Sequence, residues 1–148
     1  MALSHVFVRG VHVLAMAVAL GGSISLWWAI RTRAPLPAER AALLRFAEGY
    51  EWLFWAALGT LVMTGVGNLG ALAPAVPTTT TQWGLVLYVK LVAVLGLLLL
   101  SAVRTVVVHK LSEADTSVNV AASLSRAYAV TMLYLVGLLA LAEVLAHG

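Results

Sequence analysis

Two residues that can do chemistry lie at matching depth inside long apolar segments. His12 lies about eight residues inside the first apolar segment, and Lys90 lies about eight residues inside the third. At a helical rise of 1.5 Å per residue, each side chain is ~12 Å from the end of its segment. Polar groups at this depth of a membrane cost several kcal/mol, so both residues are candidates for function.

Three more residues extend this set. Arg9 lies three positions before His12 and Met16 lies four positions after it, so both share its helix face. Met63, late in the second apolar segment, is expected to reach the same layer from a neighbouring helix, together with the adjacent Thr64. The layer has no Asp or Glu to pair with Arg9 and Lys90. Its chemistry therefore predicts an anionic ligand that comes from outside the chain.

Haem b suits this set because it is a flat apolar disc that carries two carboxylates. His12 would be the axial ligand of the iron, Arg9 and Lys90 would pair with the propionates, and Met16 or Met63 could supply the sixth ligand. The main hypothesis is a haem b-binding membrane protein that transfers electrons or oxidises a quinol or porphyrinogen. It would then work with a quinone or a redox partner. If it is an enzyme, it is a membrane oxidoreductase with Lys90 as the candidate catalytic residue.

Two alternatives stay open. The first is a copper protein, because His12 and Met16 present a nitrogen and a soft sulfur on one face and thioethers select Cu(I), with Met63 as a further ligand. The cations Arg9 and Lys90 count against this copper site. The second alternative is a cofactor-free subunit of a larger membrane complex. Under any of these hypotheses, a homo-oligomer or a subunit of a complex is expected.

The elements that position these residues follow from composition. The chain has 148 residues, of which 62% are hydrophobic and 10% charged, and its mean hydropathy is +0.99. So few charges cannot cover a soluble surface, which excludes a soluble enzyme or a nucleic-acid-binding module. There is no cysteine, which excludes disulfides and thiolate metal sites. Four apolar segments are each long enough to cross a bilayer: residues 4–30, 51–72, 83–108 and 123–146.

The sequence therefore predicts an all-α integral membrane protein, a single domain over residues 1–148 built as a bundle of four transmembrane helices. Basic residues gather in the predicted loops 31–50 and 109–122 or beside them, whereas the Thr-rich connection 73–82 carries no charge. The positive-inside rule places both basic loops in the cytoplasm and both termini outside, in the periplasm. The expected location is the inner (plasma) membrane, with the lipid bilayer as its surroundings.

The remaining ionisable groups lie near the predicted span ends, where long side chains reach the lipid headgroups. This interpretation applies to Glu51, Arg104, His109, Arg126 and Glu143. Trp55 and the other tryptophans also lie near span ends, as anchors in the membrane interface do.

Three motifs carry a resemblance to known proteins. They are His12 followed by Ala-Leu-Gly-Gly at 19–22, the segment Met63-Thr-Gly65, and Trp83-Gly-Leu-Val-Leu-Tyr-Val-Lys90-Leu. With these motifs the chain resembles the CopD-type and HemJ-type small membrane proteins, over nearly its whole length. Both families imply a four-span unit of this size.

The two families imply different functions. The HemJ-type resemblance implies haem b on a first-helix histidine, here His12, activity that involves Lys90, and oxidation of protoporphyrinogen IX. The CopD-type resemblance implies copper uptake or resistance in the inner membrane. The sequence departs from both patterns, because positions that are aromatic in those families are small or aliphatic here. HemJ-type proteins have an aromatic pair after the histidine. CopD-type proteins often have an aromatic residue before the Gly-Gly pair, where this chain has Ala19 and Leu20.

Overall fold

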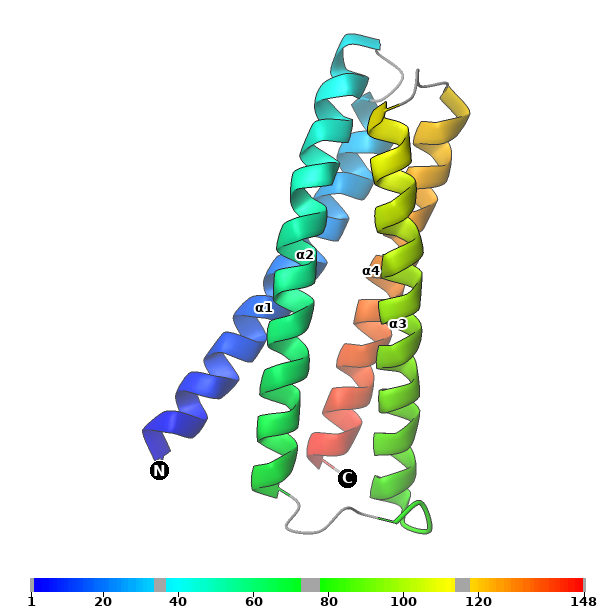
Figure 1. Cartoon of the computed structure of the whole chain (residues 1–148). Coiled ribbons are helices and arrows are strands. Elements are labelled where there is room, and N and C mark those ends of the chain that lie inside the picture. Colours follow the sequence, from blue (N-terminus) through cyan, green and yellow to red (C-terminus); the bar gives the residue numbers. More distant parts are fainter. Residues whose placement is uncertain (1, 34–36, 73–77, 114–117, 148) are drawn as a thin grey trace.

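The computed structural model describes residues 2–33, 37–72, 78–113 and 118–147, and within them the chain forms an all-α bundle of four helices (Figure 1). The helices are α1 (Ala2–Arg33), α2 (Pro37–Leu72), α3 (Gln82–Glu113) and α4 (Val118–His147). Successive helices run in opposite directions, so both ends of the chain lie where α2 ends and α3 begins (Figure 1). The predicted all-α architecture is confirmed.

Three stretches in the described part of the chain are long and apolar enough to cross a membrane: Val6–Arg33, Gln82–Lys110 and Ala121–Leu145. Large apolar side chains cover their outer surfaces, as at Phe7, Leu99 and Leu133. An apolar outer surface suits contact with lipid rather than water. The chain therefore has the helices of a multi-pass membrane protein, and α2 is the helix outside this set of three.

The loops are shorter than the sequence predicts, because the helices extend into most of the predicted connections. α2 begins at Pro37, so most of the predicted connection 31–50 is helical. Proline is favoured at the first helical position, where its missing N–H costs no bond, and the Ala, Glu, Arg and Leu residues that follow favour helix. The connection 109–122 is also partly helical, because α3 continues to Glu113 and α4 starts at Val118. Glu51 consequently lies about four turns inside α2 rather than at its start.

The core is formed by residues that recur every three or four positions along each helix. In α1 these are Ala15, Ala19, Ser23, Leu26 and Ile30. Each helix packs mainly against two neighbours, with α1 and α3 between α2 and α4. The bundle is thus a closed ring in chain order, and α1 and α3 face each other across it.

The two halves of the bundle are packed differently. Within the described residues, the buried side chains of α1 begin at Ala15 and those of α3 begin at Leu97. The first part of α1 diverges from the other three helices (Figure 1). His12 and Lys90 therefore belong to the more open half, while the tight half adjoins the ends of α1 and α3 at Arg33 and Glu113.

A close contact holds α1 against α2 in the tight half. The Tyr50 hydroxyl donates to the carbonyl oxygen of Ala19 at 2.5 Å and lies 3.0 Å from Ser23 Oγ. The Tyr50 ring covers Gly22, where a Cβ atom would overlap it. Gly22 is therefore the residue that allows this approach of the two helices.

Candidate functional site

His12 is held by a hydrogen bond between helices. Its Nδ1 lies 2.7 Å from Thr64 Oγ1 of α2, and the imidazole is half-buried beside Gly65. The Thr64 hydroxyl itself lies 2.6 Å from the carbonyl oxygen of Thr60. A carbonyl can only accept, so the single hydroxyl proton of Thr64 goes to Thr60 and Nδ1 of His12 donates to Thr64. In the neutral imidazole, this hydrogen bond leaves Nε2 of His12 without a proton, and an unprotonated ring nitrogen is the form that binds a metal.

The predicted common layer of His12 and Thr64 is confirmed by this hydrogen bond. Lys90 of α3 is half-buried, on the helix face that continues through Leu97 and Arg104. His12 and Lys90 thus lie in the open half of the bundle, on helices at opposite sides of the ring.

The other residues predicted for this site differ in whether they face the bundle or its outer surface. Met16 is half-buried and packs against the core cluster, one helical turn from His12. Arg9 is exposed, and Met63 is exposed to 77%. His12, Met16 and Lys90 therefore face the bundle, whereas Met63 lies on its outer surface, next in sequence to Thr64.

The protein donors for a metal are few. Within the described ranges, no group of three or more His, Cys, Asp or Glu side chains could hold a metal ion. The donors on this face of α1 are the imidazole nitrogen of His12 and, one helical turn further along, the thioether of Met16, which packs against the core. Such a soft, low-coordinate pair matches Cu(I) better than metals that need several oxygen ligands.

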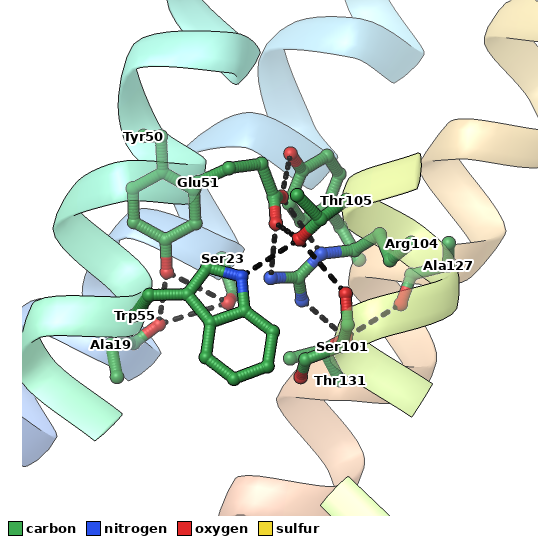
Figure 2. Close-up of polar contacts among 11 residues, drawn as sticks. Ala19, Ser23, Tyr50, Glu51, Trp55, Ser101, Arg104, Thr105, Ala127 and Thr131 are labelled. Carbon is green, nitrogen blue, oxygen red and sulfur yellow. Dashed lines mark hydrogen bonds and ion pairs between the residues drawn. The ribbon is translucent and has the colours of Figure 1, made fainter. Parts of the chain in front are cut away.

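A second polar cluster lies in the tight half, and sequence reasoning did not predict it (Figure 2). Arg104 of α3 donates from Nε and Nη2 to the two carboxylate oxygens of Glu51 of α2, at 2.8 and 3.1 Å. Both residues are almost fully buried, at 2% and 1% exposure. The expectation that they extend to the headgroups from the ends of their spans is therefore wrong. Glu51 is interior because α2 starts at Pro37, and the pair neutralises both charges inside the bundle.

Residues of α3 and α4 complete the cluster. Besides Arg104, the carboxylate of Glu51 accepts hydrogen bonds from Tyr128 Oη at 2.8 Å and from Thr105 Oγ1 at 2.5 Å. Arg104 Nη1 donates to Thr131 Oγ1 at 2.7 Å. Glu51 therefore holds α2, α3 and α4 together through the hydrogen bonds that its two carboxylate oxygens accept.

Aromatic residues enclose this ion pair. The guanidinium carbon of Arg104 lies 4.3 Å from the ring centre of Phe54 and 4.9 Å from that of Tyr128. Trp55 Nε1 donates to Thr105 Oγ1 at 2.9 Å, so this tryptophan serves the cluster although it was expected to anchor the membrane interface. The rings exclude water, which strengthens the electrostatic attraction inside.

One hydroxyl beside the cluster is unsatisfied. Ser101 Oγ is buried and has no hydrogen-bond partner in the part of the chain that the structure describes.

A second acid–base pair links α2 and α3 nearer the end of the bundle, where His109 Nδ1 lies 3.0 Å from Glu48 Oε1. Both residues of this pair are partly exposed, at 44% and 37%. His109 was expected near a headgroup region, and its exposure agrees with that.

A signal for the buried pair was present in the sequence. Glu51 and Arg104 lie near the ends of the second and third predicted spans that face the same side of the membrane. An acid and a base near the same end of adjacent spans predict an ion pair between the two helices. The pair was not predicted because each residue was compared only with the end of its own span.

Comparison with known proteins identifies one family. The family model described as copper resistance protein D matches residues 41–145. This stretch contains Lys90, Met63 and the entire Glu51–Arg104 cluster, and it begins after α1. No curated protein and no solved structure matches the chain.

Proposed function

Because the chain belongs to the copper resistance protein D family, we propose that it takes up copper or confers copper resistance, with copper as its cargo. The observation that carries the proposal at the level of residues is the hydrogen bond from His12 Nδ1 to Thr64. It leaves Nε2 as a metal ligand, with Met16 one turn further along α1. The matched stretch begins after His12, so this assignment depends on geometry.

The direction of copper movement follows from the predicted orientation. If the basic loops face the cytoplasm, His12 lies in the outer half of the membrane. Copper would then meet His12 and Met16 from the periplasmic side. This arrangement favours uptake over export as the role of the site.

Haem b, the main expectation from the residues, gains no support from the family match and stays a prediction. His12 would suit the iron of a haem as well as copper, so the two functions need a direct comparison. A purified protein from a haem-replete host that shows a Soret absorption band would favour haem, and bound copper without this band would favour the copper function. The redox role and the porphyrinogen substrate depend on the same spectrum.

Removal of the imidazole tests the copper function. In detergent and without oxygen, Cu(I) affinity is measured by competition with a coloured chelator. We expect about one Cu(I) per chain, and His12→Asn should lower the affinity at least ~30-fold, since losing even a residue that supports a ligand costs ~10–100-fold. His109→Asn is the matched control, because His109 lies in the other half of the bundle, paired with Glu48. Equal Cu(I) affinity in His12→Asn and the wild type would overturn the assignment.

The hydroxyl that orients His12 gives a second test. Thr64→Val removes the acceptor for Nδ1–H and should lower Cu(I) affinity by about 10–100-fold. Thr64→Ser restores the acceptor and should restore the affinity, which a purely structural role of the threonine methyl group would not. Thr60→Val is the control, because it removes a hydroxyl from the same helix and keeps the Thr60 carbonyl that Thr64 uses.

A further inference from the structure

A shallow pocket lies between the end of α1 and the first turns of α2. Its volume is about 300 Å³, and it is lined by Arg33 of α1 and by Glu39, Ala42, Leu43 and Phe46 of α2. The four residues of α2 share one face of that helix, because spacings of three and four positions make them neighbours on its surface. The pocket thus combines an apolar wall with one acid and one base.

The polar and apolar parts of the pocket lie at different depths. Arg33 is the last residue of the stretch Val6–Arg33, which is long and apolar enough to cross a membrane, so it marks the level of the lipid head groups. Glu39 lies beside it, with its carboxylate 4.0 Å from the guanidinium. Phe46 lies seven residues further along α2, ~10 Å closer to the middle of the bundle. The pocket is therefore polar at the membrane surface and apolar below it.

Both parts of the pocket are accessible to a ligand. Phe46 is exposed to 62% and Ala42 is also exposed, so the protein covers the apolar wall only in part. The Arg33 side chain is exposed as well, and its distance of 4.0 Å from Glu39 is too long for a hydrogen bond. Among the residues that the structure describes, Arg33 donates no hydrogen bond. Its guanidinium keeps the planar set of N–H groups that can bind a phosphate at two points.

We propose that this pocket binds one anionic phospholipid of the surrounding bilayer, with its phosphate at Arg33 and an acyl chain along Leu43 and Phe46. Such a lipid has its charge at the membrane surface and its chains below, which is the order of the groups in the pocket. Residues 31–48 carry four arginines against two glutamates, and this excess of positive charge favours an anionic lipid over a zwitterionic one. The lipid would join α1 to α2 at this end of the bundle, and its binding does not depend on the copper function.

Native mass spectrometry of the full chain in detergent tests this proposal. Phosphatidylglycerol and phosphatidylcholine with identical acyl chains are added separately, and the dissociation constant of the first bound lipid is measured. We expect the wild type to bind phosphatidylglycerol about fivefold more tightly, and Arg33→Gln should remove this preference. Arg31→Gln is the matched control, because it removes the same charge from the opposite side of α1, where Arg31 lies 5.7 Å from the ring centre of Trp27. It should keep the preference.

Two further variants distinguish lipid binding from a role in helix packing. Glu39→Gln removes the acid that repels the phosphate and should tighten phosphatidylglycerol binding about twofold, whereas loss of a merely structural ion pair would not. Phe46→Ala removes ring contacts with the acyl chain and should weaken both lipids alike, by about threefold. Equal affinity of the wild type for the two lipids, or equal effects of Arg31→Gln and Arg33→Gln, would overturn the proposal. So would a protein dimer that excludes the lipid and dissociates in Phe46→Ala, since a second copy would then occupy the pocket.

Discussion

Arg104→Leu is expected to destabilise the bundle by about 3–5 kcal/mol, because it leaves the Glu51 carboxylate buried without a counter-charge. Glu51 is 1% exposed, so it cannot turn to water without separating the helices. The two remaining donors, Tyr128 and Thr105, are neutral and cannot replace the guanidinium. Unfolding of the purified protein by SDS, followed by circular dichroism, measures the loss.

Two controls make this prediction specific. The double variant Glu51→Leu with Arg104→Leu removes both charges and should recover part of the lost stability, since an ion pair replaced by apolar side chains is often nearly neutral. Glu48→Ala breaks the more exposed pair with His109 and should cost at most about 1 kcal/mol. If the double variant is less stable than Arg104→Leu alone, the unpaired charge is not the cause of the loss.

Gly22→Val is the second change with a large expected effect. Any Cβ at this position would overlap the Tyr50 ring, which packs over Gly22 and hydrogen-bonds to Ala19 and Ser23. The helices must separate or Tyr50 must turn away, so we expect a loss of about 3 kcal/mol, at the upper end of the usual cost of overpacking. Thermal unfolding in detergent would show a clearly lower midpoint.

The neighbouring glycine offers a matched control. Gly21 has nothing within 4 Å of its Cβ position, so Gly21→Val adds the same atoms to the outer surface and should leave the midpoint nearly unchanged. Adding Tyr50→Ala to Gly22→Val should relieve the overlap, and the double variant should be destabilised by less than the sum of the two single changes. Similar destabilisation by Gly21→Val and Gly22→Val would contradict the assigned contact.

The sequence was sufficient for the architecture. Long apolar segments with few charges leave membrane helices as the simplest solution, since backbone polar groups must be satisfied inside lipid. The residue count along each segment also placed His12 and Thr64 in one layer, which their hydrogen bond confirms. Depth is readable from sequence because a helix rises by a constant amount per residue.

The sequence does not predict in the same way which side of each helix faces the inside of the bundle. The polar and apolar residues of α2 are not separated onto different faces, so no polar face shows which side chains turn inward. Met63 was therefore expected at the site, yet it lies on the outer surface while Thr64 turns toward α1. The Glu51–Arg104 pair was missed because the start of the second span was set by the first uninterrupted apolar run, which made Glu51 a terminal residue.

The buried pair has a consequence for how the chain enters a membrane during its synthesis. α2 emerges before α3, and it carries Glu51 without the arginine that will neutralise it. We therefore expect α2 to insert stably across the bilayer only together with α3. The two helices would then insert as one hairpin, because Arg104 neutralises the charge of Glu51 inside the membrane.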